Sequence, residues 1–214
     1  MPELVTNTNG ILLAVLIGYL LGSIPWGLVV ARAMNLGDLR SIGSGNIGAT
    51  NVLRTGNRRA AALTLLLDIG KGAAAVLIAR ALWAGDAAQV AALAAFLGHC
   101  YPLWLKFRGG KGVATFIGIM LALSWKVGLA VIGTWLLFAF TLRWSSLAAL
   151  AAAASSTMWM FMFGRGETFF LGVGLTVLIY WRHRENIRRL EAGTEPKIGQ
   201  GERRPDGKPD ADKE

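Results

Sequence analysis

The chain has 214 residues, of which 54% are hydrophobic and 16% are charged, and its mean hydropathy is +0.47. These values exclude an ordinary water-soluble globule, which needs more polar surface. A single cysteine excludes a disulfide scaffold, and with two histidines it provides no residue set for a structural zinc site. The net charge of +9 does not indicate a nucleic-acid partner, because no soluble basic domain carries it. The sequence predicts a polytopic membrane protein, and it shows no metal or cofactor signature.

The apolar residues gather in seven runs, and most are long enough to cross a hydrocarbon core as a helix. We expect membrane helices at residues 11–33, 60–83, 87–105, 112–123, 127–142, 145–163 and 168–181. The fourth run is short, and Pro102 interrupts the third. The first run lacks a basic start and a cleavage site, so we expect it to be a retained helix rather than a signal peptide. The predicted fold class is all-α, with about seven transmembrane helices.

The basic residues indicate the orientation of these helices, because Lys and Arg accumulate in short cytoplasmic loops. With the N-terminus outside, three of the 22 basic residues fall at outer ends, namely Arg80, Lys126 and Arg165. Lys71 falls inside a helix, and the remaining basic residues fall on the inner side. The odd number of crossings and the charge asymmetry both predict an external N-terminus and a cytoplasmic C-terminus.

The chain is expected to divide into an integral-membrane domain, residues 1–198, and a cytoplasmic tail, residues 199–214. The tail mixes acidic and basic residues with two prolines and carries no large apolar side chain, so we expect it to be disordered. Within the membrane domain, the Gly18/Gly22 pair and the alanines of residues 148–154 predict close helix packing, because small residues let helix backbones approach each other in lipid.

Residues 39–56, LRSIGSGNIGATNVLRTG, are the least lipid-like segment of the first half. Their glycines permit positive φ, so successive backbone N–H groups can converge on an anion. Arg54 adds a planar guanidinium that suits a phosphate or carboxylate. A flexible polar turn is the alternative, but the density of donors favours an anion-binding nest. The residues assigned to substrate binding here are Gly43, Gly45, Asn46, Gly48, Thr50 and Asn51, beside Ser44.

A second polar segment, residues 106–115, reads KFRGGKGVAT. Its glycines Gly109, Gly110 and Gly112 surround Lys111 and offer backbone donors beside a point charge, at the expected start of a helix. It is not a Walker A loop, because a glycine and not Ser or Thr follows the lysine. Lys106 and Arg108 are expected to fix the orientation of the helices in the membrane, whereas Lys111 is expected to bind an anion.

The third polar segment, residues 181–197, reads WRHRENIRRLEAGTEPK and follows the last apolar run. If the helix continues, His183 and Asn186 lie three residues apart on the same face. His183 is expected to donate to a phosphate or to assist proton transfer near neutral pH. Attraction to anionic lipid headgroups is the alternative role for the arginines of this segment.

Some ionisable side chains fall well inside the apolar runs. Asp68 and Lys71 lie three residues apart and are expected to pair with each other or with the glycine loops, because ionisable groups in a membrane are costly. Asp68 is assigned a structural role, and Lys71 is expected to reach a substrate near the cytoplasmic end. We expect His99 to be a packing or interfacial residue, with involvement in the site as the alternative, and Cys100 to be an inert buried thiol.

Several chemistries lack their residues. No carboxylate pair is present for metal-assisted hydrolysis, no Cys/His nucleophile pair appears, and neither histidine is followed by aspartate at the spacing of histidine–aspartate acyltransferases. The polar segments instead predict a site for a phosphorylated molecule, and two donor-rich loops predict two anionic groups. A transporter or flippase for an anionic lipid or phosphorylated metabolite is the alternative, but the polar segments cluster on one side and show no inverted repeat.

Five runs carry a family resemblance: GSIPWG at residues 22–27, GSGNIGATNVLR at 43–54, LDIGKG at 67–72, GHCYPLWLKFRGGKGVAT at 98–115 and RHRENIRRLEAGTE at 182–195. The chain resembles the bacterial acyl-phosphate:glycerol-3-phosphate acyltransferases over most of residues 20–195. The resemblance implies a seven-helix inner-membrane enzyme with its active site on the cytoplasmic side. It further implies transfer of a fatty acyl group from acyl phosphate to the sn-1 hydroxyl of glycerol 3-phosphate, giving lysophosphatidic acid and phosphate.

The same resemblance assigns roles to matching residues. It places the essential serine and arginine of the family's first motif at Ser44 and Arg54, and a structurally important glutamate at Glu195. The histidine and asparagine of its third motif fall on His183 and Asn186. Its phosphate-binding loop for glycerol 3-phosphate falls on Gly109, Gly110, Lys111 and Gly112.

The implied reaction fits the residues that are present. An acyl phosphate is an activated mixed anhydride, so the glycerol hydroxyl can attack it directly without a covalent acyl-enzyme. The proton is expected to pass to His183 or to a phosphate oxygen of the substrate. No cofactor is needed, and the acyl chain is expected to lie between helices among membrane lipids. The sequence carries no signal for an oligomeric state.

Overall fold

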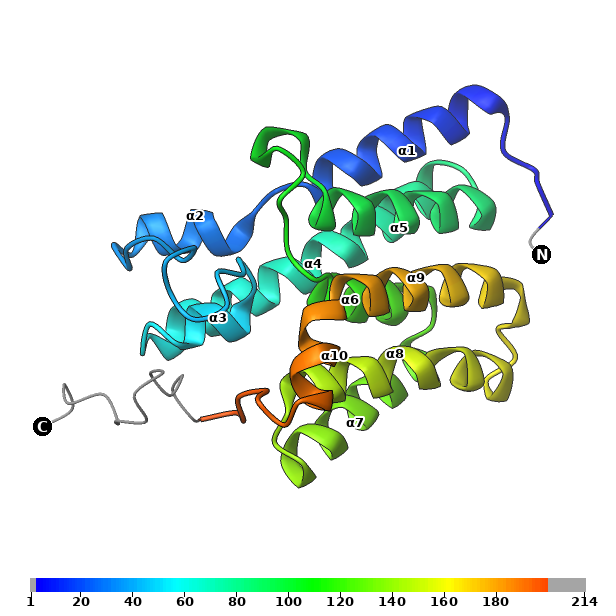
Figure 1. Ribbon diagram of the computed structural model, residues 1–214. Helices are drawn as coiled ribbons and strands as arrows, with labels where there is room; N and C mark the ends of the chain where they lie inside the picture. The colour runs from blue at the N-terminus through cyan, green and yellow to red at the C-terminus, as the bar shows by residue number, and fades with distance from the viewer. Residues whose placement is uncertain (1–2, 200–214) are drawn as a thin grey trace, which may run out of the picture.

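The computed structural model describes residues 3–199, and this part of the chain is all-helical, without a strand (Figure 1). The helices are α1 Thr8–Gly22, α2 Trp26–Ala33, α3 Ala49–Leu53, α4 Arg58–Leu82, α5 Gly85–Cys100, α6 Val113–Leu123, α7 Trp125–Thr141, α8 Ser145–Met162, α9 Phe169–Arg182 and α10 Arg184–Glu191, with short 3₁₀ turns η1 Leu103–Leu105 and η2 Gly166–Thr168. The predicted all-α class is confirmed. The tail expected to be disordered lies, from residue 200 onward, outside the described residues.

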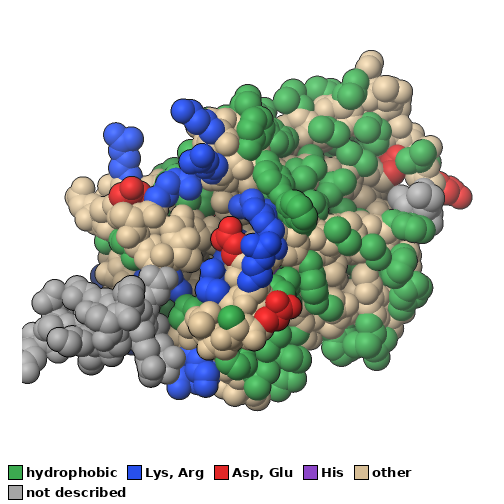
Figure 2. Space-filling model, in the orientation of Figure 1, with side chains coloured by type: hydrophobic (Ala, Val, Ile, Leu, Met, Phe, Trp, Pro, Cys, Tyr) green, Lys and Arg blue, Asp and Glu red, His purple; other side chains and the backbone are tan. Residues whose placement is uncertain are grey.

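The helices have the length and surface of a multi-pass membrane protein. Among the described residues, four helical stretches are long and apolar enough to cross a bilayer: Thr8–Ala33, Arg58–Leu82, Gly85–Leu105 and Ser145–Met162. Helices α6 and α7 are apolar but shorter. Large apolar side chains face outward along these helices, and Phe140 is 80% exposed. In Figure 2 such side chains cover the half opposite the basic ones, as expected for a surface that faces lipid.

The first apolar run does not form the single helix expected at residues 11–33. Helix α1 ends at Gly22, and α2 begins at Trp26 after a break at Ser23, Ile24 and Pro25. The proline causes the break, because its ring occupies the position of the amide hydrogen and clashes with the preceding turn. The break leaves the Ile24 carbonyl available to a side chain from another helix, Lys71 in α4.

Close packing through small residues is confirmed. Gly18 and Gly22 of α1 lie directly on the backbone of Ala91 and Ala95 in α5, where a β-carbon would overlap main-chain atoms. In α8, four of the alanines in residues 148–154 are buried, namely Ala148, Ala149, Ala152 and Ala153. The helices therefore approach at distances that only small side chains permit.

Two further features, the end of α5 and the presence of α3, differ from expectation. Helix α5 ends at Cys100, before the end expected at residue 105, because Pro102 cannot continue it. The last membrane helix, α9, ends within one residue of the expected residue 181, and His183 separates it from α10. The first polar segment contains the five-residue helix α3, which no apolar periodicity indicated.

The polar segments gather at one end of the helix bundle (Figure 1). Helices α2, α3 and α10 lie at this end, whereas the start of α1 and the turn between α4 and α5 lie at the other. Most basic side chains in Figure 2 lie over the same polar end. This arrangement agrees with the expectation that all three polar segments face one aqueous compartment.

Candidate functional site

The second polar segment is a folded loop fixed to α5. Its backbone turns through left-handed conformations at Lys106 and Phe107, with φ of 52° and 60°. The amides of Gly109 and Gly110 then donate to the Cys100 and His99 carbonyls at 3.1 and 3.0 Å. These two amides are thus occupied within the protein. The donors that the segment directs elsewhere are the Lys111 ammonium and the backbone at the start of α6.

Lys111 extends from this loop to the third polar segment. Its ammonium donates to the Asn186 side-chain oxygen at 2.5 Å. Asn186 in turn donates to one carboxylate oxygen of Glu195 at 2.7 Å, and Arg189 donates to the other at 2.7 Å. Lys111, Asn186 and Glu195 therefore form one continuous polar chain, with Asn186 itself 6% exposed. The sequence predicted all three as site residues.

Burial weakens the charge of Lys111. It lowers the pKa of the ammonium from 10.5 to about 8, more than the nearby Glu195 carboxylate raises it. The lysine is therefore mostly protonated at neutral pH but loses its proton in mildly alkaline solution. A cation that is only partly hydrated binds an incoming phosphate more strongly than a fully solvated lysine does.

His183 sits at the junction of α9 and α10 and is 3% exposed. Its Nδ1 lies 2.8 Å from the Ile179 carbonyl oxygen. A carbonyl only accepts, so Nδ1 carries the hydrogen and the neutral ring presents a lone pair at Nε2. Burial, followed by the nearby Lys111 charge, lowers the pKa of His183 from 6.5 to about 4. The imidazole is thus neutral at physiological pH and is suited to accept a hydrogen bond.

Glu195 holds the end of the third segment against α10 and α8. Partial burial would raise the pKa of its carboxyl group, but the nearby Ser146, Asn186 and Arg189 side chains outweigh this effect and the pKa is lowered. Its backbone carbonyl accepts from the Trp144 indole at 3.1 Å. The glutamate therefore fixes Asn186 and the returning chain, which agrees with the structural role expected for it.

The first polar segment folds around Asn51, which is 2% exposed. The Asn51 amide donates to the Leu39 carbonyl at 2.9 Å, and its oxygen accepts from the Ser44 backbone at 3.2 Å. Gly43 has φ of +52° and lies against the Arg54 side chain. Asn51 therefore organises the loop from within, whereas the hydroxyl-bearing side chains of Ser44 and Thr50 are exposed.

The remaining glycines and Asn46 of this segment shape the loop. Gly45 has φ of +63°, which a β-carbon would strain, and it lies over the Arg40 carbonyl. Gly48 precedes helix α3 in an extended conformation. The Asn46 side-chain oxygen accepts from the Ile47 backbone at 2.9 Å. The segment is therefore a series of tight turns held by contacts within the loop.

One arginine links the first and second segments. Arg40 donates from its guanidinium to the Arg108 carbonyl at 2.7 Å. The described contacts of Ser44 remain within its own loop, and those of Lys111 run to the third segment. The second and third segments thus form one cluster, the first segment forms another, and Arg40 joins the two.

Asp68, Lys71 and His99 form a buried group behind the loops. Asp68 and Lys71 pair at 2.7 Å, which confirms the pairing expected for them, and both side chains are 3% exposed. Lys71 also donates to the Ile24 carbonyl at 2.8 Å, so its described contacts are with the protein. The His99 Nδ1 lies 3.7 Å from the Asp68 carboxylate. Cys100 is fully buried, as expected.

Arg182 links the third polar segment to the second, and the sequence did not assign it a role. It donates to the carbonyls of Gly110 and Gly109 at 3.1 and 3.2 Å, and its guanidinium lies over the Tyr101 ring at 5.1 Å. In the sequence, its position next to His183 in the third motif was the feature that could have indicated a role for it. The bidentate contact with backbone carbonyls is not visible in a sequence. Within residues 3–199, no group of three or more His, Cys, Asp or Glu side chains is placed to hold a metal ion.

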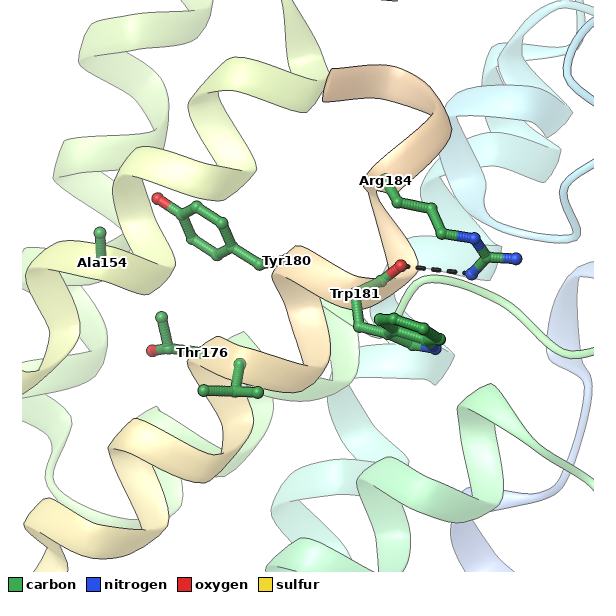
Figure 3. Close-up of a pocket in the computed structure, with 6 residues that line it drawn as sticks. Ala154, Thr176, Tyr180, Trp181 and Arg184 are labelled. Atoms are coloured by element: carbon green, nitrogen blue, oxygen red, sulfur yellow. Dashed lines mark hydrogen bonds between the residues drawn. The ribbon is translucent and has the colours of Figure 1, made fainter. Parts of the chain in front are cut away.

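A groove of about 660 Å³ runs along the outer side of α8 and α9 (Figure 3). Ala154, Thr176, Val177 and Tyr180 line its apolar part. At the polar end, Arg184 lies over the Trp181 ring at 5.2 Å and donates to the Trp181 carbonyl at 3.3 Å. The groove thus reaches the residue that follows His183.

The comparisons with known proteins agree with this geometry. The family model described as glycerol-3-phosphate acyltransferase matches residues 12–193. The chain belongs to this family. A glycerol-3-phosphate acyltransferase of Ruegeria pomeroyi is 64% identical over 200 residues, which are 94% of this chain and 98% of the relative. One of Dinoroseobacter shibae is 58% identical, over 93% of this chain and 98% of the relative.

Two solved structures of family members share the fold. Both are crystal structures of PlsY (YgiH), an integral membrane glycerol 3-phosphate acyltransferase. The glycerol 3-phosphate form has a TM-score of 0.83 at 40% identity and covers 88% of this chain and 96% of that one. The lysophosphatidic acid form has a TM-score of 0.79 at 38% identity, covering 88% and 95%. The resemblance inferred from the motifs is confirmed, and the protein is a membrane-integral acyltransferase.

Proposed function

We propose that the protein transfers a fatty acyl group from acyl phosphate to the sn-1 hydroxyl of glycerol 3-phosphate, giving lysophosphatidic acid and phosphate, the first step of phospholipid synthesis. The observation that carries this proposal is the polar chain from Lys111 through Asn186 to Glu195, with neutral His183 buried beside it. This arrangement provides one desolvated cation and one hydrogen-bond acceptor at the end of an apolar helix bundle. It suits a phosphorylated alcohol that reacts with a lipid-like donor.

The two clusters are assigned to the two phosphoryl groups. Lys111 and the backbone at Gly112, where α6 begins, bind the phosphate of glycerol 3-phosphate, because a helix start favours an anion. Arg54 and the Ser44 hydroxyl bind the phosphate of the donor, with the turns at Gly43 and Gly45 as support. Arg54 and Ser44 then neutralise the charge on the leaving phosphate, while Lys111 holds the acceptor in position.

The transfer needs no covalent intermediate. The sn-1 oxygen forms a bond to the acyl carbon, and the bond from that carbon to the phosphate oxygen breaks, so that phosphate leaves with the electron pair. His183 accepts a hydrogen bond from the attacking hydroxyl at Nε2 and aligns it. With its pKa near 4, His183 is a weaker base than a phosphate dianion, whose pKa is about 6. The proton therefore passes to a phosphate oxygen of the substrate.

The groove along α8 and α9 is assigned to the acyl chain of the donor. Most of its lining side chains are apolar, and Arg184 lies at its polar end. Filling it with Ala154→Trp should lower the rate with long-chain acyl phosphates more than with short-chain ones. Leu77→Trp, on the exposed face of α4, is the matched control and should not change chain-length preference. Equal loss for all chain lengths with Ala154→Trp would contradict this assignment.

We also infer the setting of the enzyme in the membrane. Residues 1–198 form one domain with seven crossings, an external N-terminus and the polar end in the cytoplasm of a bacterial cell, in the inner membrane. Support comes from the gathering of basic side chains at the polar end, which also carries α2, α3 and α10 (Figure 2). Glycerol 3-phosphate, a soluble acceptor, then enters from the cytoplasm. The acyl donor and membrane lipids contact the side of the helix bundle that faces the bilayer.

The test of the proposed function is turnover by the purified protein. Mixed with acyl phosphate and labelled glycerol 3-phosphate, it should release phosphate and form labelled lysophosphatidic acid without added metal or ATP. A transporter or flippase is the rival function because the same loops would bind anions. Accumulation of label inside vesicles with no new lipid product would favour the rival and overturn the proposal.

A further inference from the structure

Gly110 is held on three sides by protein groups. Its amide donates to the His99 carbonyl at 3.0 Å, and its carbonyl accepts from Arg182 at 3.1 Å. On the third side, the His99 imidazole occupies the space that a β-carbon of residue 110 would need. Gly110 is itself buried. Its small size is therefore required by contact with His99, within the protein.

The His99 ring is held in turn by α4 and by the break in the first membrane helix. Its Nδ1 faces the Asp68 carboxylate at 3.7 Å, and Asp68 pairs with Lys71 at 2.7 Å. Lys71 donates to the Ile24 carbonyl at 2.8 Å. The ring is buried, as are Asp68 and Lys71. A continuous series of polar contacts thus runs from Ile24, through α4, to the imidazole under the glycine loop.

We propose that His99, backed by Asp68 and Lys71, is a positioning residue that sets the location of Gly110 and thereby of the Lys111 ammonium. On this account, glycine is required at position 110 by the imidazole below it and not by the approach of a substrate. Lys111 is the next residue, and its distance to Asn186 depends on where Gly110 rests. The inference deepens the proposed function, since it concerns the same loop.

A double-mutant cycle separates the two explanations for Gly110. Gly110→Ala alone should raise the KM for glycerol 3-phosphate about tenfold with a smaller change in kcat, because the added methyl lifts Lys111 away from Asn186. In a His99→Ala background the space is open, so the same substitution should raise KM less than about threefold. Equal effects of Gly110→Ala in both backgrounds would overturn the proposal.

Gly109→Ala is the matched control. A β-carbon at residue 109 meets the His99 carbonyl, Pro102 and the Cys100 backbone, none of which His99→Ala removes. Its effect on KM should therefore be the same with and without the imidazole. Relief of Gly109→Ala by His99→Ala would show general loosening of the loop, and this result would also overturn the proposal.

A conservative variant tests the support from α4. Asparagine at residue 99 keeps a nitrogen near the position of Nδ1 and removes the part of the ring over Gly110. His99→Asn should therefore retain more glycerol 3-phosphate affinity than His99→Ala, and Asp68→Asn should remove that advantage. If His99→Asn and His99→Ala have the same KM, Asp68 does not position the residue and this part of the proposal fails.

The melting temperature of the detergent-solubilised variants provides a readout that does not depend on the reaction. If the wild-type protein forms no lysophosphatidic acid, the proposed function fails, but the cycle can still be read from stability. Gly110→Ala should lower the melting temperature in the wild-type background by more than in the His99→Ala background. Additive shifts would overturn the steric inference whether or not the enzyme is active.

Discussion

Lys111 is the residue whose environment most directly affects binding. Its ammonium donates to Asn186 and lies near the Glu195 carboxylate, and burial lowers the pKa of the ammonium to about 8. Removing it leaves Asn186 and Glu195 without the cation that completes the polar chain. The role of Lys111 can therefore be examined through pH as well as through substitution.

The pH dependence of kcat/KM should show the titration of Lys111. The pKa of its ammonium is lowered, so the charged form is present below about pH 8 and is lost above it. The rate should therefore fall as the pH rises through about 8. Lys111→Arg keeps its charge at high pH, so its remaining activity should lack this alkaline limb. An unchanged alkaline limb in the arginine variant would exclude Lys111 as the titrating group.

Ser44 and Arg54 are expected to contribute to the reaction through the donor phosphate. Ser44→Ala and Arg54→Ala should each lower kcat/KM by at least about 10²-fold, the effect of losing one donor to developing charge. Arg59→Ala, at an exposed position on α4, is the control and should retain activity. Near-normal turnover by folded Arg54→Ala protein would remove this residue from the site.

Glu195 should contribute to stability through its two hydrogen bonds. Glu195→Gln loses the charge that Arg189 and Asn186 contact, which costs about 1.5–3 kcal/mol for a charge-assisted bond. The melting temperature in detergent should fall. Glu191→Gln, exposed at the end of α10, should leave it unchanged. Equal melting temperatures for the two variants would show that Glu195 does not hold the segment in place.

At the level of helices, small residues determine how closely α1 and α5 pack. Gly22→Val would place side-chain atoms on the Ala95 backbone and should lower stability by about 1–3 kcal/mol, as overpacking does. Gly174→Ala in α9 meets no atom within 4 Å and is the control. It should be neutral or slightly stabilising, because alanine favours a helix. Thermal unfolding in detergent measures both, and equal stability of Gly22→Val and wild type would contradict the observed contact.

The helix boundaries show what the sequence contains and what it does not. Apolar runs predicted α4 and α8 closely, because a membrane helix needs an uninterrupted apolar stretch. The break at Pro25 had a visible cause but lay within a run that was otherwise apolar. The break at His183, between α9 and α10, has no proline or glycine beside it in the sequence to indicate it. Helix α3 is too short for any periodicity to indicate it.

The candidate site was predictable to a similar extent. Lys111, His183 and Asn186 were identified from their motifs, and the structure brings Lys111 into contact with Asn186. The sequence did not indicate that the amides of Gly109 and Gly110 donate to carbonyls of the protein itself. A glycine loop that binds an anion and one that bonds to its own protein have the same composition. The assignment of Arg182 also required coordinates, since its partners are backbone carbonyls.

At the scale of the whole molecule, the separation of a polar end from an apolar body predicts how the protein sits in the membrane. Gly85→Cys, at the turn between α4 and α5, should react with an impermeant thiol reagent added from the periplasm. Ser41→Cys, exposed at the polar end, should be protected until the membrane is opened. Native Cys100 is buried and should not react. Labelling of Ser41→Cys from outside would reverse the proposed orientation.

On the proposed mechanism, one end of the bundle binds both phosphorylated substrates at the same time and lets them react directly. Initial rates measured while both acyl phosphate and glycerol 3-phosphate are varied test this most directly. Reciprocal plots should intersect, as required when a complex with both substrates precedes any product. Parallel lines, with phosphate released from acyl phosphate before glycerol 3-phosphate is added, would indicate an acyl-enzyme and contradict the account.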